Sequence, residues 1–167
     1  MDTLADLIET LGLQPHPEGG YYKETYRSKD IITKDALPHI FNGNRNYSTG
    51  IYYLLESEDF SAFHRINQDE MWHFYKGDAL SLTMISDKGE VTTVKIGNAI
   101  SKGEVPQALV PKGYWFAAKV EQPNSYALLG CTVAPGFDFK DFELAQRTKL
   151  IAQFPQHKDL ITALTRD

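Results

Sequence analysis

The stretch at residues 63–78, FHRINQDEMWHFYKGD, carries the strongest fold signal in the chain. The turn residues Asn67-Gln68-Asp69 divide it into two extended runs, and a second turn, Lys76-Gly77-Asp78, ends it. Side chains of a strand alternate between its two faces. In the second run, one face carries Glu70, Trp72 and Phe74, and the other carries Met71, His73 and Tyr75. Because both faces are bulky, we predict a strand that is covered on both sides.

The same texture extends on both sides of this stretch. From Tyr21 to about Ala134, short runs rich in Tyr, Val, Ile, Thr and Phe are divided by turn residues at short spacing. The turns include Asn42-Gly43-Asn44, Asp87-Lys88-Gly89, Pro111-Lys112-Gly113 and Gln122-Pro123-Asn124. This pattern is typical of an antiparallel sandwich or barrel of about eight or nine strands. The predicted fold class is therefore mainly β.

Helical patterns flank the β region. Leu4, Leu7, Ile8 and Leu11 recur at helical spacing, and Gly12 can end the helix in a left-handed conformation. After the barrel, we expect Asp141 to cap a helix that stops before Pro155. That helix would carry Phe142, Ala145, Ile151 and Phe154, and a last short helix would present Leu160, Ile161 and Leu164. The prediction is one domain over residues 1–167, with an N-terminal helix at 1–13, a barrel at 20–135 and C-terminal helices at 138–166.

Composition excludes several classes of protein. The 167 residues carry 17 Lys and Arg against 22 Asp and Glu, a net charge of −5, so a nucleic-acid partner is not expected. No run approaches the roughly 20 apolar residues of a membrane span, so no membrane partner is expected. The acidic start does not resemble a secretory signal, and the single cysteine, Cys131, suits a reducing compartment. We therefore expect a cytoplasmic protein.

The 63–78 stretch resembles the first cupin motif, which places two His as H-x-H, then Glu and then Gly. His64 matches the first His, Glu70 the Glu and Gly77 the Gly, but Ile66 stands at the second His position. Residues 111–116 resemble the second motif, P-x-G-x-x-H, with Phe116 in place of its His. The chain thus resembles a cupin that lacks two of the usual ligand positions.

Further phrases resemble the uncharacterised fifth cupin family of bacteria and fungi over nearly the whole chain. They are the runs at residues 15–21 (PHPEGGY), 24–28 (ETYRS), 110–113 (VPKG) and 133–137 (VAPGF). The resemblance implies a double-stranded β-helix, the RmlC-like jelly-roll barrel, with a small-molecule pocket inside. It also implies a homodimer. It supplies no reaction and no named ligand.

A metal site is the first chemical interpretation of these residues. Cupin metals use three His and one Glu, and only His64 and Glu70 stand at matching positions. His73 could complete a set for an oxygenase-type divalent metal. However, Glu70 and His73 are three residues apart, so a regular strand points them to opposite faces unless a bulge intervenes. We therefore predict no cofactor, with a metal at His64, Glu70 and His73 as the alternative.

Acid–base chemistry is the second interpretation. A carboxylate bonded to one imidazole nitrogen raises the basicity of the ring, and the other nitrogen can then move a proton near neutral pH. We predict that His64 and Glu70 form this catalytic pair, projecting to the same side from paired strands and lying within hydrogen-bond reach directly or through one water. The arrangement resembles that of the metal-free sugar-nucleotide epimerases among cupins, which add a Tyr acid. Four tyrosines are candidates for that role, namely Tyr21, Tyr52, Tyr53 and Tyr75.

The walls of the pocket are expected to be aromatic and apolar. The candidate ligand-binding residues are Trp72, Phe74, Trp115, Phe116, Tyr52, Ile66 and Glu18. For each aromatic residue, plain core packing is the alternative role. Glu18 and Arg27 could close the barrel mouth or pair with each other, and Cys131 lies in an apolar strand where thiols are inert.

Three functions follow from these residues. The first is an isomerase- or epimerase-like enzyme, working without metal on a small polar metabolite such as a sugar derivative. The second is a non-catalytic small-molecule binding protein, favoured by the apolar Ile66 and Phe116 at ligand positions. The third is the metal-dependent oxygenase, which requires His73 to turn inward. We also expect a homodimer through the face that carries Met71, His73 and Tyr75.

Overall fold

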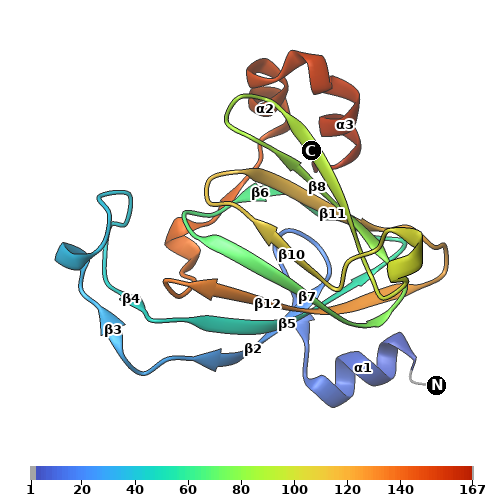
Figure 1. The fold of residues 1–167 in the computed structure, drawn as a ribbon, viewed down its shortest axis with the longest axis horizontal. Helices are drawn as coiled ribbons and strands as arrows, with labels where there is room; N and C mark the ends of the chain where they lie inside the picture. Colours follow the sequence, from blue (N-terminus) through green and yellow to red (C-terminus); the bar gives the residue numbers. More distant parts are fainter. Residues whose placement is uncertain (1–2, 167) are drawn as a thin grey trace.

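Two antiparallel sheets face each other and enclose the core, as the computed structural model shows for residues 3–166 (Figure 1). The larger sheet has the strand order β1-β2-β5-β12-β7-β10, the smaller has β13-β6-β11-β8-β9, and β3 pairs with β4 in a separate arm. The strands are β1 (Gln14–Pro15), β2 (Tyr21–Arg27), β3 (Ile31–Ile32), β4 (Arg45–Asn46), β5 (Thr49–Glu56), β6 (Ser61–Arg65), β7 (Asp69–Gly77), β8 (Leu80–Ile85), β9 (Val91–Ile96), β10 (Gln107–Val110), β11 (Trp115–Val120), β12 (Tyr126–Ala134) and β13 (Glu143–Leu144). The helices are α1 (Leu4–Leu11), α2 (Arg147–Gln153) and α3 (Lys158–Ala163), with 3₁₀ turns η1 (Lys34–Ala36), η2 (Ile100–Lys102), η3 (Phe139–Asp141) and η4 (Pro155–His157). This arrangement confirms the mainly β prediction.

The core between the sheets follows the period-two pattern. On β7, Trp72 points inward and is 1% exposed, and its neighbours Ala108 and Val110 on β10 are buried with it. A register shift in the β12 pairing follows Phe74, and Tyr75 then lies over Gly130 with half of its surface exposed. The outer face of β7 is therefore only partly covered within one chain, and the predicted cover on both faces requires a second chain.

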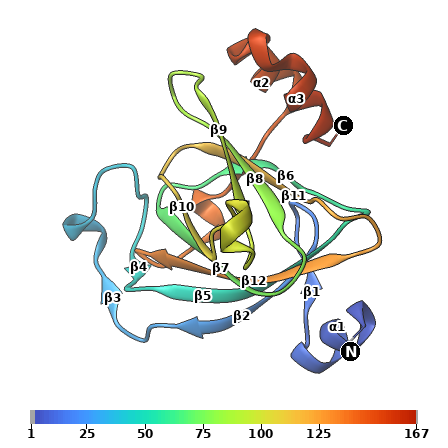
Figure 2. The ribbon, with the colours of Figure 1, turned by 45° about the vertical axis from the view of Figure 1, so that its right-hand side comes forward.

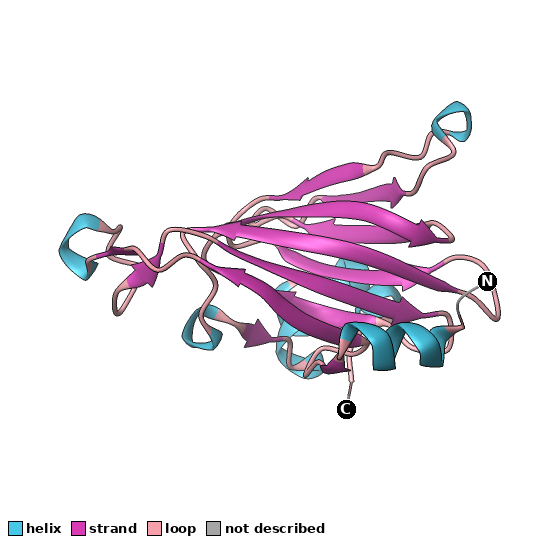
Figure 3. Cartoon of the chain, turned by 90° about the horizontal axis from the view of Figure 1, so that it is seen from below, coloured by secondary structure: helices cyan, strands magenta, loops and turns pink. Residues whose placement is uncertain are grey.

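Helix α1 covers part of the outer face of the larger sheet (Figures 1 and 3). Its start is fixed by a capping box between Thr3 and Asp6, and Gly12 ends it with a φ of 64°. Leu7 is buried against Leu54 and Leu128 of the sheet. The predicted N-terminal helix is confirmed, with its left-handed glycine.

Helices α2 and α3 pack on the outer face of the smaller sheet, at the opposite side of the molecule from α1 (Figure 2). Leu150, Phe154 and Ile161 are buried there with Phe63 and Trp115. The predicted capping role of Asp141 is wrong, because this residue ends η3 and forms a buried ion pair, while α2 starts only at Arg147. None of the helices in residues 3–166 is long and apolar enough to cross a membrane.

Candidate functional site: a charged cavity between the sheets

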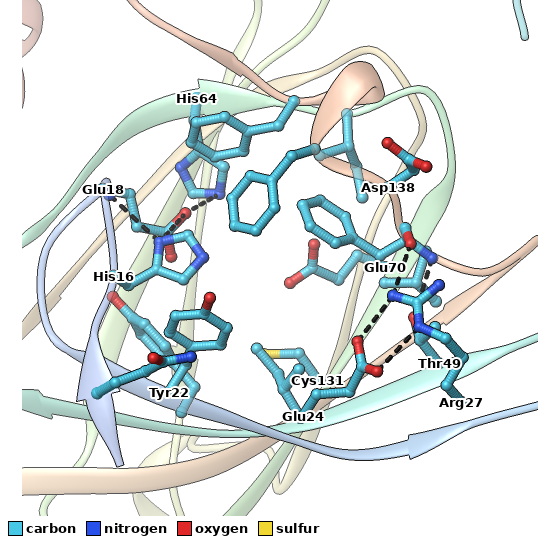
Figure 4. Close-up of a pocket in the computed structure, with 18 residues that line it drawn as sticks. His16, Glu18, Tyr22, Glu24, Arg27, Thr49, His64, Glu70, Cys131 and Asp138 are labelled. Carbon is cyan, nitrogen blue, oxygen red and sulfur yellow. Dashed lines mark hydrogen bonds and ion pairs between the residues drawn. The ribbon is translucent and has the colours of Figure 1, made fainter. Parts of the chain in front are cut away.

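A cavity of about 510 Å³ opens between the two sheets at one end of the barrel (Figure 4). It receives side chains from β2, β5, β6, β7 and β12, and from residues 137–142 after the last long strand. Figure 4 shows the Glu70 carboxyl directed to the middle, a cluster of His16, Glu18 and His64 on one side, and the pair of Glu24 and Arg27 on another. The cavity thus gathers titratable groups within a mostly apolar barrel.

The turn between β1 and β2 places His16 and Glu18 at this cavity. It closes with hydrogen bonds from the His16 N–H to the Gly20 carbonyl at 2.9 Å and from the Gly19 N–H to the His16 carbonyl at 3.0 Å. Gly19 and Gly20 have φ values of 117° and 70°, and a side chain at either would collide with the Phe60 or Leu54 carbonyl. The glycine pair therefore lets the turn press against β5 and β6.

Glu18 and His64 form a buried ion pair at the floor of the cavity. His64 Nε2 lies 2.7 Å from Glu18 Oε2, and Nδ1 lies 2.7 Å from the Ala62 carbonyl. Burial disfavours charge on both groups. The opposite charges and the hydrogen bond between them outweigh it, and they lower the pKa of Glu18 and raise the pKa of His64. Both ring nitrogens of His64 face oxygen acceptors, so the geometry favours the imidazolium form opposite the Glu18 carboxylate.

His16 remains neutral beside this pair. Burial lowers its pKa, and the charge of Glu18 offsets only part of that effect. Its Nδ1 accepts the Glu18 backbone N–H at 3.2 Å, which leaves the ring proton on Nε2. Figure 4 shows this second nitrogen directed into the cavity. His16 therefore offers a hydrogen-bond donor to whatever occupies the cavity.

Glu70 is the carboxyl whose pKa lies nearest to neutrality. It is 8% exposed, and burial raises its pKa to about 7, with the nearby charge of Glu18 acting in the same direction and that of His64 against it. Glu18 and Glu70 thus have pKa values pushed apart in one cavity. The Cys131 thiol beside them stays protonated, since burial raises its pKa far above its usual range.

The predicted hydrogen bond between His64 and Glu70 is not formed directly. Both ring nitrogens of His64 are occupied, one by Glu18 and the other by the Ala62 carbonyl. The reason lies in the topology: β6 and β7 are consecutive in sequence but belong to opposite sheets. His64 and Glu70 therefore both line the cavity, as expected, but from facing walls and not as cross-strand neighbours.

The mouth of the cavity holds a second charged pair. Arg27 donates to both carboxylate oxygens of Glu24, at 2.9 and 2.7 Å, and also to Asn46 Oδ1 and the Phe137 carbonyl. The alternative that Glu18 pairs with Arg27 is therefore wrong. Phe137 and Phe139 pack edge to face beside this pair, with ring centroids 4.9 Å apart.

Five of the seven predicted ligand-binding residues are not among those lining the cavity, whereas Glu18 and Ile66 are. Trp72, Phe74 and Phe116 pack in the core between the sheets, Trp115 packs under the C-terminal helices, and Tyr52 packs near α1 on the outer face. These aromatic side chains thus lie where the alternative role, core packing, places them. Phe116 still contacts the site, because its ring centroid lies 4.0 Å from that of His64.

Of the four candidate tyrosines, Tyr53 lines the cavity. Its hydroxyl donates to the Gly19 carbonyl at 2.7 Å, and burial raises its pKa well above the usual range. Tyr22, which the sequence reasoning missed, also lines the cavity. His16 was missed as well, although it stands in the PHPEGGY run that carries the family resemblance. The family resemblance of that run was the feature of the sequence that could have identified His16 as a site residue.

The residues do not fit a cupin-type metal. His73 lies on the outer face of β7, where it contacts Thr132 Oγ1 at 2.8 Å and Gln107 at 3.0 Å, so it is not available as the third ligand. The nitrogens of His64 are already engaged, and Ile66 and Phe116 offer no donor atom. Within residues 3–166, no group of three or more His, Cys, Asp or Glu side chains is arranged to hold a metal ion.

Comparisons with known proteins place this chain among the cupins. The family model described as "Cupin superfamily (DUF985)" matches residues 5–145, and the chain belongs to this family. Protein SO0799 from Shewanella oneidensis has a similar structure, with a TM-score of 0.90 and 41% identity over 99% of both chains. Uncharacterized protein YML079W of Saccharomyces cerevisiae is 34% identical over 83% of this chain and 73% of its own length.

A more distant likeness supports the fold alone. Oxalate decarboxylase from Bacillus subtilis superposes with a TM-score of 0.53 at 16% identity, over 90% of this chain and 36% of that one. The barrel is thus a cupin barrel, and the chemistry of its cavity has to be argued from its own residues.

Proposed function

We propose that the chain is a metal-independent enzyme that moves a proton on a small polar metabolite, as isomerases and epimerases do. The observation that carries this proposal is Glu70, a buried carboxyl directed into a cavity with a pKa of about 7. A group that titrates near the working pH can both remove and return a proton. Titratable groups whose pKa values are pushed apart in one cavity are a recurring pattern of acid–base sites.

Each cavity residue has a role in this proposal. The ionised form of Glu70 removes a proton from a carbon beside a carbonyl group, and the electron pair of the broken C–H bond shifts onto the carbonyl oxygen. His16 Nε2–H donates a hydrogen bond to that oxygen. Return of the proton from Glu70 to a carbon completes the isomerisation. The ion pair of Glu18 and His64 acts as a fixed charge near Glu70, and this replaces the His64–Glu70 pair expected from the sequence.

The experiment has two stages. A thermal-shift screen of sugars, amino sugars, hydroxy acids and amino acids identifies ligands, and each ligand is then incubated with the protein in D₂O. Proton NMR should show loss of one C–H signal from at least one ligand. Glu70→Gln should slow this exchange about 100-fold or more. Glu58→Gln, at an exposed residue outside the cavity, is the matched control.

A non-catalytic binding protein is the second candidate. Ile66 lines the cavity where cupins carry a metal-ligating His, and this makes one wall apolar. Ligands that stabilise the protein but exchange no C–H proton in D₂O would favour this candidate over the enzyme. Elemental analysis tests the expectation of no resident metal, and about one transition metal per chain would contradict it.

We also propose that the chain forms a homodimer and works in the cytoplasm, without a nucleic-acid or membrane partner. The net charge of −5 and the single buried cysteine support the partner and compartment inferences. The partly exposed outer face of β7 supports the dimer.

A further inference from the structure

The groups that could carry positive charge at the cavity are already engaged. Arg27 directs its guanidinium nitrogens to Glu24, Asn46 and the Phe137 carbonyl. His64 directs both ring nitrogens to Glu18 and the Ala62 carbonyl. His16 is neutral at pH 7 because burial lowers its pKa. An anionic ligand would find no unpaired cation among the described residues that line the cavity.

Carboxyl groups, in contrast, exceed the cations. Glu18, Glu24, Glu70 and Asp138 all line the cavity, and the first two have an ion-pair partner. No ion pair within residues 3–166 involves Glu70 or Asp138 at a distance of 4.0 Å or less. Asp138 accepts the Lys140 backbone N–H at 2.8 Å, and Glu70 is more than nine-tenths buried and directed into the cavity. Neither carboxyl thus has a close ion-pair partner among the described residues, although the charges of Arg27 and Arg45 act on Asp138 and that of His64 acts on Glu70 from a distance.

Aromatic rings complete the environment. Phe137, Phe139 and Phe142 all line the cavity and contact one another, with Phe139 and Phe142 centroids 5.8 Å apart. The ring centroid of His16 lies 6.0 Å from that of Phe139 and 5.9 Å from that of Phe142. The faces of such rings attract cations and pack against the carbon frame of a ligand. The aromatic wall and the two carboxyls therefore both favour a ligand with a positive charge.

We infer that this cavity selects an amine-bearing cation, with the ammonium group at Glu70 and the carbon frame against the phenylalanine rings, and that it rejects phosphorylated and carboxylate metabolites. The inference names the substrate class of the proposed enzyme and so rests on the proposed function, with one carboxylate oxygen of Glu70 binding the ammonium group and the other accepting the C–H proton. This substrate class excludes the sugar nucleotides of the metal-free cupin epimerases, because a diphosphate would need free cations in the cavity.

Three probes of matched size and different charge test the inference: benzylamine, benzyl alcohol and benzoate. Titration calorimetry and ligand-observed NMR at millimolar concentrations measure their binding at pH 8, where Glu70 is mostly ionised. Benzylamine should bind about ten-fold or more tightly than benzyl alcohol, which is the scale of a hydrogen bond to a charged group. Benzoate should not bind.

Variants assign the preference to residues. Glu70→Gln should reduce benzylamine affinity to that of benzyl alcohol, while benzyl alcohol affinity is retained and shows that the cavity is intact. Asp138→Asn should weaken benzylamine binding less, and Glu58→Gln should leave all three affinities unchanged. Equal binding of the three probes, tighter binding of benzoate, or no binding of benzylamine would overturn the inference. A clear preference for the amine without any C–H exchange would support the inference and overturn only the proposed catalysis.

Discussion

Two buried ion pairs in this chain have similar exposure and different surroundings. Arg45 and Asp141 form a bidentate pair, with Nε and one amino nitrogen at 2.7 and 2.6 Å from the two carboxylate oxygens. Gln68 also donates to Asp141, at 2.8 Å. His64 and Glu18 form a single contact at 2.7 Å. Of these two pairs, only the second lines the cavity of about 510 Å³.

The difference shows how burial alone fails to identify a functional charge. Asp141 is fully bonded, and its pair joins the arm of β3 and β4 to the segment after the barrel. Such a pair holds the chain in place. The pair of His64 and Glu18 faces a third ionisable group, Glu70, across open space. A charge in contact with a cavity can act on a ligand, whereas one enclosed by its partners cannot.

The structural role of the first pair predicts a large loss of stability on its removal. Asp141→Ala leaves Arg45 buried without its counter-ion, so the free energy of unfolding should fall by about 3–5 kcal/mol. Urea unfolding followed by circular dichroism measures this change. Glu143→Ala, two residues away, removes the exposed partner of Arg65 and should change stability by about 0–1 kcal/mol. Similar effects of both variants would contradict the structural role of Asp141.

Glu70 should show the opposite behaviour, because its burial opposes ionisation. Its pKa is about 7 in the folded chain and has an ordinary value of 4.5, so the folded state holds the proton more tightly. Stability therefore decreases as pH rises from 4.5 through about 7. Glu70→Gln removes this dependence, and it should stabilise the chain at pH 8, relative to pH 5, by up to about 3 kcal/mol.

Urea unfolding of wild type and Glu70→Gln at both pH values measures this gain, with Glu58→Gln as the control. An unchanged difference between pH 5 and pH 8 would mean that Glu70 has an ordinary pKa. Glu70 would then behave like a surface carboxyl, and burial would not oppose its ionisation.

The two faces of β7 extend the comparison from pairs to surfaces. Glu70 and Trp72 point inward, while Met71 and His73 point outward beside Leu109 of β10, which is 46% exposed. We predict that this outer face forms a homodimer, so light scattering should give twice the 18.9 kDa of the chain. Leu109→Lys should weaken the dimer about ten-fold or more, since it places a charge in an apolar contact. Val91→Lys, on the edge strand of the other sheet, should have no effect.

The sequence predicts the fold more completely than the site. Alternation on β7 places Glu70 and Trp72 inward, and helical spacing finds α1, because both patterns depend on neighbours in sequence. The partner of His64 depends instead on which sheet each strand joins. The stretch 66–68 crosses between the sheets, so His64 meets Glu18, which is 46 positions earlier in the chain, and does not meet the nearby Glu70.

The aromatic residues illustrate the same limit. Trp115 and Phe116 are adjacent and both buried, but they belong to different cores because successive side chains of β11 point to opposite faces. The alternation of side chains along a strand separates its two faces, but it does not indicate which face lines a cavity. The position of the cavity depends on which side chains fill the barrel, including Phe137 and Phe139, which lie beyond the last long strand.

The smallest predicted effect concerns the two histidines of the cavity. The pKa of His64 is raised above 6.5 and that of His16 is lowered below it, so the two rings should titrate on opposite sides of this value. Glu18→Gln removes a charge that raises both pKa values, and the hydrogen bond that His64 donates becomes one to a neutral amide oxygen, so the pKa of His64 should fall further than that of His16. Two-dimensional ¹H–¹³C NMR of the imidazole rings across the pH range measures both pKa values.

The stability that the ion pair of Glu18 and His64 contributes also depends on pH. The contribution of His64 to stability is fully present below pH 6.5 and is lost as pH rises through its folded pKa, whereas that of Glu18 is present above 4.5 and is lost as pH falls. Glu18→Gln should therefore destabilise the chain most between about pH 4.5 and 6.5. Coincident titration of the two rings near 6.5 would show that Glu18 and His64 do not form a charged pair in solution, and the contrast with Arg45 and Asp141 would then be one between an ion pair and a neutral contact.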